Sequence, residues 1–416
     1  MRFSFCKLFF INSTLIYDRM GMSPFTKQEL IPQPEKLEIS KHETKLFIGI
    51  PKETSYQERR ICLTPDAVNS LTSHGHRVMI ESGAGLSSSY TDKEYSDAGA
   101  EITLDTKKVM SCPMLLKVEP LTLPEIEIIQ PETIVISAIQ LKTRTKDYFE
   151  LLAKKKITAL AFEYIKDEDG SYPAVKCLSE IAGTASILIA AEFMSSNQFG
   201  KGLLFGNITG VPPTEVVILG AGTVGEFAAK TAIGLGANVK VFDNSITKLR
   251  RLQNTLNQRI FTSTIQPKSL LKALRRCDVA IGAMRGKDRS PVVVTETMVE
   301  HMKKGAVIVD VSIDTGGCFE TSEVTTHEKP IFIKNNVIHY CVPNIPSRYS
   351  KSASLSISNI LTPFLLQIGD DGGIESAIRF DKGLRNGVYL YHGILTNNAI
   401  GEWFNLPNSD INLIVF

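Results

Sequence analysis

Short apolar runs alternate with segments of helical period along most of this chain. A run that is apolar throughout and bounded by turn residues indicates a strand buried on both faces of a sheet. Alternation of such strands with helices predicts βαβ units and a mostly parallel sheet. We expect a first series of strands at 45–50, 77–81, 109–117, 134–139 and 157–162. We expect a second series at 215–219, 238–242, 279–283 and 306–311.

The clearest predicted helices are 65–73, 179–194 and 357–368. A Gly/Pro-rich loop at 200–213 marks a domain junction, and a Pro/Ser-rich passage at 342–356 precedes the last helix, which we expect to pack back on the first lobe. The pattern predicts an α/β protein of two doubly wound, Rossmann-like lobes with an interdomain cleft. The predicted division is an N-terminal extension at 1–45, a first domain of 46–175 with 350–416, and a second domain at 176–349.

Length and composition agree with this picture and exclude several classes of protein. A chain of 416 residues corresponds to two or three domains, and 43% apolar residues exclude disorder over most of it. The 46 basic and 44 acidic residues leave a net charge of +2, so charge predicts neither a nucleic-acid partner nor an anionic membrane surface. The longest apolar stretch, near 185–191, ends at Glu192 and is shorter than the ~18–20 residues of a membrane span, so no membrane association is expected.

The seven cysteines are scattered and form no C-x-x-C pair. This spacing predicts no disulfide framework and no metal site, and indicates reduced, mostly buried thiols in a reducing compartment, the cytoplasm. Residues 1–18 make a poor signal peptide, because Asn12-Ser13-Thr14 interrupts the apolar patch. Met20 and Met22 offer alternative starts, which leaves open whether residues 1–21 belong to the mature protein.

The sharpest motif is a glycine-rich sequence, Gly220-Ala221-Gly222-Thr223-Val224-Gly225, between a β-branched strand and a helix. Its glycines permit a tight turn, a close approach to a pyrophosphate and close packing of helix on strand, while the helix N-terminus favours the phosphate charge. Asp243 ends the next strand, where its carboxylate can accept both ribose hydroxyls and would repel a 2′-phosphate. The motif predicts NAD. We interpret Lys248, Arg250 and Arg251 as a solvated helix face, with NADP as the alternative cofactor.

A second candidate follows the strand at 306–311. Asp314 comes just after this strand and before Gly316-Gly317. Groups at the carboxyl ends of strands in a doubly wound sheet lie beside the cofactor, so Asp314 is a candidate catalytic residue. The alternative is a turn-forming aspartate ahead of two glycines. Asp310, inside the strand, is expected to be structural.

Several stretches together resemble the alanine dehydrogenase family, which shares its fold with the NAD-binding subunit of proton-translocating transhydrogenase. The matching stretches are 48–54, 60–65, 81–85, 179–183, 220–225, 309–317 and 342–346, in unbroken order. The resemblance implies reversible, NAD-dependent oxidative deamination of L-alanine to pyruvate and ammonia in a homohexamer.

The same resemblance implies roles for individual residues. Arg60 falls on the arginine that grips the substrate carboxylate, a bidentate task suited to a guanidinium. Asp314 falls on the catalytic aspartate, and Asn344 lies on a loop that covers the nicotinamide end and binds substrate. The implied cofactor contacts are Ser179, Gly220, Gly222, Thr223, Val224, Gly225, Asp243, Lys248, Ile313, Asn344 and Ile345.

The chain departs from the family pattern at two places. Gln140 stands where the family has its catalytic histidine; an amide can hydrogen-bond a keto oxygen but cannot act as a general acid or base. The family's Lys-x-Lys-Glu-Pro is shortened here to Lys117-Val118-Glu119-Pro120, and Lys117 is predicted to bind substrate if the end of the strand shifts.

These departures keep alternative functions open. One is an NAD(H)-binding subunit of the transhydrogenase type, a branch that also lacks the histidine. Others are an NAD-binding homologue with little catalysis, and an enzyme acting on another small or a lysine-derived amino acid.

Overall fold

The computed structural model of the protein describes residues 43–55, 57–286 and 289–415. Nearly all of the predicted N-terminal extension, with both alternative start methionines, lies outside the described residues.

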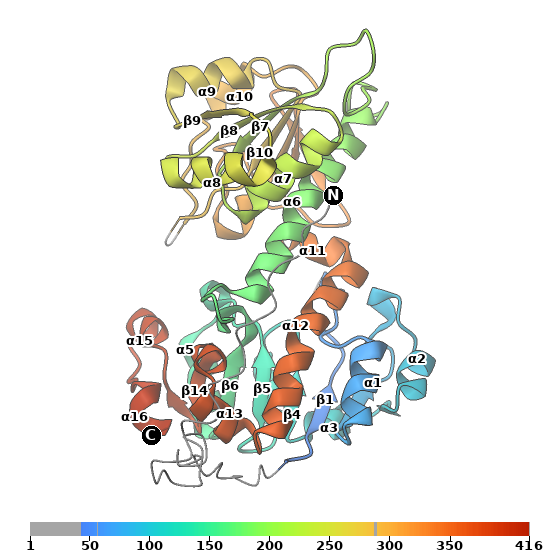
Figure 1. Ribbon diagram of the computed structural model, residues 1–416, viewed down its shortest axis with the longest axis vertical. Coiled ribbons are helices and arrows are strands. Elements are labelled where there is room, and N and C mark those ends of the chain that lie inside the picture. Colours follow the sequence, from blue (N-terminus) through green and yellow to red (C-terminus); the bar gives the residue numbers. More distant parts are fainter. Residues whose placement is uncertain (1–42, 56, 287–288, 416) are drawn as a thin grey trace, which may run out of the picture. The chain divides into compact units, whose positions relative to one another are not determined.

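Strands from two parts of the chain form the first sheet (Figure 1). Its order is β15-β14-β6-β5-β4-β1-β2-β3, and the six strands from β3 to β6 run parallel, whereas β14 and β15 are antiparallel additions. The order 3-2-1-4-5-6 of the parallel strands is that of a doubly wound sheet. The strands are β1 (Phe47–Ile50), β2 (Arg77–Glu81), β3 (Glu101–Thr103), β4 (Met114–Leu116), β5 (Ile134–Ser137), β6 (Thr158–Ala161), β14 (Val388–Tyr391) and β15 (Ile394–Leu395).

The second sheet repeats this winding. Its order is β12-β13-β11-β10-β7-β8-β9, with only β12 antiparallel, so β7, β8, β9, β10, β11 and β13 again follow 3-2-1-4-5-6. The strands are β7 (Glu215–Leu219), β8 (Asn238–Phe242), β9 (Phe261–Ser263), β10 (Val279–Gly282), β11 (Val307–Asp310), β12 (Ile331–Lys334) and β13 (Val337–Tyr340). The predicted two-lobed α/β architecture is confirmed.

Both faces of each sheet are buried, as the continuous apolar runs predicted. Val216 and Ile218 of β7 pack in one core cluster and Val217 and Leu219 in another, because side chains alternate between the faces of a strand. The first sheet divides its side chains in the same way. The longer helices that cover the sheets are α1 (Pro65–Ser73), α5 (Lys146–Lys154), α6 (Pro173–Ser195), α7 (Thr223–Gly234), α8 (Ile246–Leu256), α9 (Pro267–Leu274) and α12 (Ser350–Asp370). The shorter helices are α2 (Asp92–Asp97), α3 (Thr106–Met110), α4 (Leu123–Ile128), α10 (Glu296–Glu300), α11 (Ile345–Arg348), α13 (Ile374–Phe380), α14 (Lys382–Gly387), α15 (Asn398–Phe404) and α16 (Ile411–Val415).

The last long helix packs on the first lobe as expected, but its start was predicted wrongly. α12 begins at Ser350, so the second half of the Pro/Ser-rich passage is helical. Ile357, Leu361 and Leu365 join the core of the first sheet. Serines in this helix also bond to the first lobe, since Ser354 Oγ accepts the Ile61 amide at 2.9 Å. Serine suits these positions because its hydroxyl accepts hydrogen bonds from loop amides that would otherwise be buried without a partner.

Two other expectations need correction. The run 109–117 is not one strand: its start belongs to α3, and only Met114–Leu116 forms β4. The analysis also missed β3 and β9, which are three-residue strands at sheet edges, and the four strands β12–β15. Short edge strands carry little apolar periodicity, because only part of their surface is buried.

α6 is longer and more apolar than the sequence analysis allowed. It has 23 residues and a mean hydropathy of 1.5 over its best window, so one helix of the described chain has the length and composition of a membrane span. Its apolar side chains have partners within the protein, however. Ile187, Ile189 and Phe193 lie in the core of the second sheet, and Gly183 lies so close to α7 that a Cβ there would sit 2.4 Å from the Val224 oxygen.

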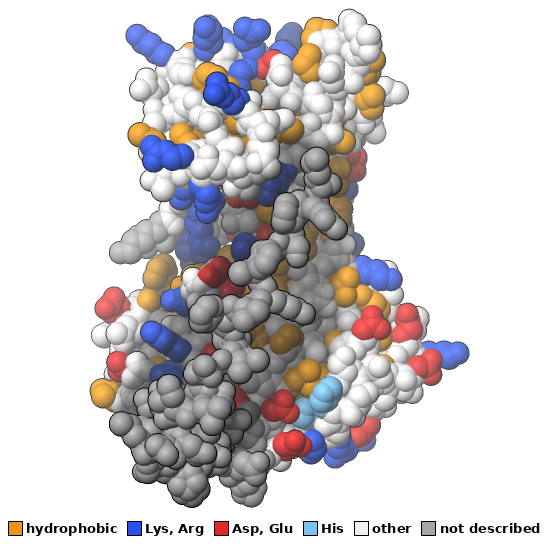
Figure 2. All heavy atoms as spheres, in the orientation of Figure 1, with side chains coloured by type: hydrophobic (Ala, Val, Ile, Leu, Met, Phe, Trp, Pro, Cys, Tyr) orange, Lys and Arg blue, Asp and Glu red, His pale blue; other side chains and the backbone are white. Residues whose placement is uncertain are grey.

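Although the net charge is close to zero, basic and acidic residues are unevenly distributed along the chain. Residues 244–277, which include α8 and α9, carry eight Lys or Arg and no Asp or Glu. Figure 2 shows basic side chains gathered at the top of the view, where Figure 1 labels α9 and α10. All six cysteines within the described residues are free, and five of them are buried.

Candidate active site

The predicted site residues follow the carboxyl ends of strands in both sheets, where ligands of doubly wound folds bind. In the second sheet the central strands β7 and β10 meet where the winding reverses, and the glycine loop 220–225 follows β7. In the first sheet β1 and β4 meet in the same way. Arg60 lies on the loop after β1, and Lys117 directly follows β4.

The glycine loop has the three properties that its motif predicts. Gly220 has φ +111°, a conformation that side chains rarely adopt. A Cβ on Gly225 would lie 1.9 Å from the Gly220 oxygen, so helix and strand approach too closely for a side chain. A Cβ on Gly222 would meet nothing within 4 Å, which leaves the backbone open to a ligand. α7 begins at Thr223, directly behind this open position. The loop therefore fits a pyrophosphate.

Asp243 stabilises this loop from the end of β8. Its Oδ2 accepts the Ala221 amide at 2.8 Å, and its Oδ1 accepts the Ser245 amide at 2.7 Å. The buried carboxylate therefore stands directly against the glycine loop, as a ribose-binding acid must. Lys248 lies in the first turn of α8, where its amide is bonded to Ser245 Oγ at 3.3 Å.

Arg251 contacts the glycine loop, so it is not simply part of a solvated helix face. Its Nη2 donates to the Ala221 oxygen at 3.3 Å and lies 3.8 Å from Glu226 Oε2, although the side chain is 55% exposed. Ser179 and Ile313 complete the predicted cofactor residues. Ser179 lies one turn before Gly183, where α6 touches α7, and Ile313 is buried in the turn after β11.

The aspartate that ends β11 and the one that follows it differ in their surroundings. Asp310 is fully buried, and its carboxylate accepts the Cys318 amide at 2.9 Å and the Ser322 hydroxyl at 2.7 Å. Asp314 is reached by solvent, yet protein surrounds most of it. This burial raises the pKa of its carboxyl, against the lowering effect of the Asn344 amide. Asp310 is thus a scaffold residue, and Asp314 is free to meet a ligand.

Asn344 connects Asp314 with the first lobe. It begins α11 in the left-handed conformation, with φ +55°. Its amide nitrogen donates to Asp314 Oδ1 at 3.1 Å, and its side-chain Nδ2 donates to Glu58 Oε2 at 2.9 Å. Ser347 supports the same contact, because its hydroxyl donates to the Gln57 oxygen at 2.7 Å. Residues from the ends of both sheets therefore share one hydrogen-bonded network.

Arg60 is the buried cation of this network. Its Nε donates to Glu58 Oε1 at 2.8 Å and its Nη2 to Glu58 Oε2 at 2.6 Å, a bidentate pair. The same Nη2 lies 3.9 Å from Glu119 Oε1. Burial alone would raise the pKa of Glu58, but the guanidinium outweighs it and lowers this pKa to about 2. Arg60 keeps Nη1 for a further acceptor, as no hydrogen bond of that nitrogen occurs within the described part of the chain.

Gln140 follows β5 with φ +46°. Its Nε2 donates to both carboxylate oxygens of Glu119, at 2.8 and 2.7 Å. Its backbone amide donates to Glu163 Oε1 at 3.3 Å, and burial raises the pKa of Glu163. The structure thus brings Gln140 to the group around Arg60, but its amide is engaged by a carboxylate.

Lys117 is bound away from this group. Its ammonium is fully buried and donates to Glu125 at 2.8 and 3.0 Å, with Glu53 at 3.7 Å. Burial raises the pKa of Glu53 to about 8, against the lowering effect of Lys117. Glu125 is the nearer carboxyl partner of Lys117. This geometry is that of a buried structural ion pair.

The sequence analysis missed the acidic residues of the site. Glu53, Glu58, Glu119 and Glu163 follow β1, β4 and β6 and surround the predicted cations. Their signal was available, since each lies just beyond a strand that the analysis had predicted. Without the winding order, however, nothing in the sequence shows that these strand ends meet.

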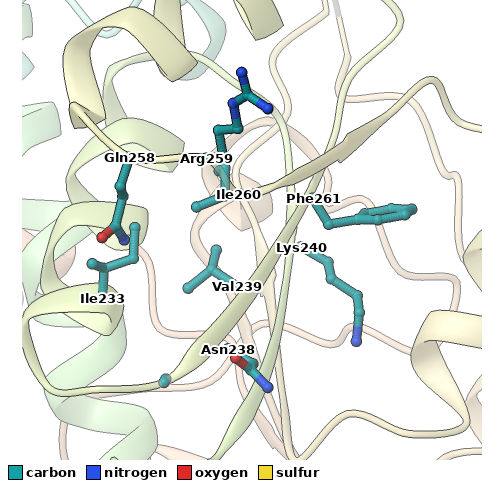
Figure 3. A pocket seen from close by; sticks show the side chains of 9 residues that line it. Ile233, Asn238, Val239, Lys240, Gln258, Arg259, Ile260 and Phe261 are labelled. Carbon is teal, nitrogen blue, oxygen red and sulfur yellow. The ribbon is translucent and has the colours of Figure 1, made fainter.

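One described cavity lies away from these residues. About 250 Å³ in volume, it is lined by Ile233, Asn238, Lys240 and Phe261 among others (Figure 3). These residues mark the amino ends of β8 and β9, the edge opposite to the glycine loop. A doubly wound sheet binds its ligands at the carboxyl edge, so this cavity carries no argument for the site.

Comparison with known proteins identifies sequences similar to this chain. Models described as the N-terminal and C-terminal domains of alanine dehydrogenase/PNT match residues 49–182 and 186–398. An alanine dehydrogenase of Mycolicibacterium smegmatis is 36% identical over 88% of this chain and 98% of its own length. One of Bacillus subtilis is 37% identical over 86% of this chain and 94% of its own.

Solved structures of similar fold give the same result as the sequence comparison. One named L-alanine dehydrogenase is 33% identical, with a TM-score of 0.81 over 86% of this chain and 99% of its own. A transhydrogenase from Sinorhizobium meliloti shares the fold, at 24% identity and a TM-score of 0.72 over 85% of this chain and 99% of its own.

Proposed function

Since this chain belongs to the alanine dehydrogenase/PNT family, we propose that it is an NAD-dependent alanine dehydrogenase. The reaction is the reversible oxidative deamination of L-alanine to pyruvate and ammonia. The observation that carries the proposal is the network in which Asn344 bonds both to Asp314 and to the Glu58–Arg60 pair. Through this network Asp314 lies beside the loop that we propose covers the nicotinamide. Arg60, whose guanidinium can bind a substrate carboxylate, belongs to the same site.

The glycine loop and its surroundings hold the cofactor in this proposal. The open backbone at Gly222 and the start of α7 take the pyrophosphate. Asp243 binds the adenosine ribose, and its charge against the loop favours NAD over a cofactor with a 2′-phosphate. The other contacts are Ser179, Gly220, Thr223, Val224, Gly225, Lys248, Ile313, Asn344 and Ile345. NAD supplies the acceptor for the hydride that leaves the substrate Cα.

The substrate lies between Arg60 and Asp314. The free Nη1 of Arg60 meets the carboxylate, and the Asn344 amide fixes Asp314 next to the amino group. Asp314 takes a proton from that end of the substrate, a role that its raised pKa favours. Gln140 acts in the site through Glu119, because its amide nitrogen donates to both oxygens of that carboxyl. Lys117, held by Glu125, acts on substrate only through the charge that it contributes.

Three further features belong to the proposal. The homohexamer rests on the family resemblance, and the cytoplasmic location on the scattered cysteines. The division into a substrate domain (46–175 with 350–416) and a dinucleotide-binding domain (176–349) rests on the sequence pattern. The small-molecule substrate pair is the expected ligand.

The test is an initial-rate assay of the purified chain with NAD and L-alanine at alkaline pH, beside the reverse reaction with pyruvate, ammonia and NADH. Turnover in both directions supports the proposal. Exchange between NADPH and an NAD analogue in the presence of a membrane partner, without alanine turnover, would instead assign the transhydrogenase-type function. NADH binding without either activity would identify a catalytically altered homologue.

A further inference from the structure

The site needs a proton carrier in addition to Asp314, and histidine does not supply it. No histidine in the described ranges hydrogen-bonds to Arg60, Gln140 or Asp314. Deamination moves more than one proton, because water must lose a proton as it adds to carbon and nitrogen must gain one as it leaves. A second acid–base group in the site is therefore to be expected.

Glu119 is placed to be that group. It follows β4 at the winding reversal of the first sheet, where it is nearly buried but not sealed, since 11% of its side chain is exposed. Gln140 Nε2 donates to both of its oxygens, which fixes the orientation of the carboxyl plane. The charged groups that face it are Arg60 at 3.9 Å and the carboxyls of Glu58 and Glu53.

Glu119 and Glu58 form an unequal carboxyl pair. Arg60 Nη2 lies 2.6 Å from Glu58 Oε2 and 3.9 Å from Glu119 Oε1, so the same guanidinium faces both carboxyls. The bidentate contact with Arg60 keeps Glu58 ionised. Burial, and secondly the Glu58 charge, raises the pKa of Glu119 to about 7. Two acids whose surroundings separate their pKa values in this way commonly divide the roles of anchor and proton carrier.

We propose that Glu119 is the acid–base residue that exchanges a proton between water and the substrate nitrogen, with Gln140 as its positioning residue and Glu58 as its charge partner. The inference rests on the proposed function. In deamination, the starting species is the iminium that hydride loss leaves on the substrate. Water adds to its carbon, the C=N electron pair moves to nitrogen, and ionised Glu119 takes the water proton.

The second half of the step returns this proton. Glu119 gives it to the nitrogen of the carbinolamine, the C–N bond breaks with its electron pair on nitrogen, and ammonia leaves. Asp314 has by then released the amino proton of the substrate to solvent, and it takes the remaining hydroxyl proton as the C=O bond forms. Glu119 ends ionised as it began, and Asp314 releases its proton to solvent, so that atoms and charge balance.

This assignment predicts the same pH dependence in both directions. Deamination starts with ionised Glu119, so its rate should fall as pH drops below about 7. Reductive amination runs the same steps backwards and also starts with ionised Glu119, so its rate should fall over the same range. In Glu119→Gln both limbs should vanish, because an amide does not titrate.

Transient kinetics can show whether Glu119 acts after the hydride has left the substrate. With Glu119→Gln and L-alanine, we expect a burst of reduced nicotinamide near one equivalent per site, followed by steady-state turnover about 10²–10⁴-fold slower than in the wild type. Glu119→Asp should restore part of the turnover and the pH limb, while Gln140→Leu should shift the limb without removing it. Glu127→Gln, the same change at an exposed position of α4, is the matched control.

A direct titration separates this inference from the proposed function. Infrared difference spectra of the ligand-free protein should show two titrating carboxyls in the wild type and in Glu127→Gln, Glu119 near pH 7 and Glu53 near pH 8. In Glu119→Gln the carboxyl near pH 7 should be missing, and that of Glu53 should remain. That result supports the carboxyl pair even if L-alanine is not turned over, in which case only the substrate assignment fails. Persistence of the carboxyl signal near pH 7 or of the pH limb in Glu119→Gln, or loss of the limb in His327→Gln instead, would overturn the role given to Glu119.

Discussion

Lys117 offers a sharp contrast between what a sequence motif implies and what burial implies. The motif places a substrate-binding lysine here, whereas the structure gives a fully buried ammonium that is paired with Glu125 at 2.8 Å. Replacing it by methionine keeps much of the side-chain volume but leaves the Glu125 carboxylate without its cation. Breaking a buried ion pair on one side costs ~3–5 kcal/mol, because the remaining charge stays desolvated. We therefore expect Lys117→Met to lose stability of this order.

The assay is urea unfolding of the wild type and of Lys117→Met at neutral pH, followed by circular dichroism. Lys146→Met is the control, since Lys146 forms an exposed pair with Glu150, about half exposed on each side, and such helix pairs contribute about 0.3–0.5 kcal/mol. Only the buried variant should unfold at a clearly lower urea concentration. An unchanged unfolding midpoint for Lys117→Met, together with a large rise in the KM for L-alanine, would refute this reasoning and restore the substrate-binding role.

Three other variants test the remaining parts of the site. Asp314→Asn should abolish turnover and leave NADH binding, measured by fluorescence titration, near that of the wild type; loss of both would point to a structural role. Gly225→Ala places a methyl group 1.9 Å from the Gly220 oxygen, so NADH affinity and thermal stability should both fall, and a variant with normal affinity would contradict the loop geometry. Asp243→Asn removes the charge that opposes a 2′-phosphate, so the ratio of the NADPH to the NADH dissociation constant should fall in competitive binding. An unchanged ratio would contradict the role given to Asp243 in cofactor selection.

The architecture followed from the sequence because both sheets bury both faces. Runs such as Val216–Leu219 are apolar at every position, and they alternate with helices, so the doubly wound class could be predicted. Most strand bounds were nearly correct, with the run 109–117 as the exception. Among the strands that escaped prediction, β3 and β9 lie at sheet edges and are too short and too polar to carry the pattern. The missed strands β13 and β14 are instead buried inside their sheets. These are the elements in which tertiary pairing, rather than local sequence, decides the structure.

The candidate site was predicted less completely than the fold. Its cofactor half is local: six consecutive residues and one acid at the end of the next strand define it. Its substrate half is not local, because Glu58, Glu119 and Gln140 come from three different strand ends. Sequence spacing could not show that Gln140 bonds to Glu119, or that Lys117 turns to Glu125. Both contacts depend on the order in which the strands assemble.

The most direct test of the proposed function follows the hydride itself. Incubating the protein with NAD and L-alanine deuterated at Cα, and analysing the reduced nicotinamide by mass spectrometry, asks whether this C–H bond is the one that breaks. The proposal predicts one deuterium at C4 of the reduced nicotinamide and a slower first turnover than with unlabelled alanine. Bound NAD without any deuterium transfer would contradict the assignment of this site to the oxidation of L-alanine.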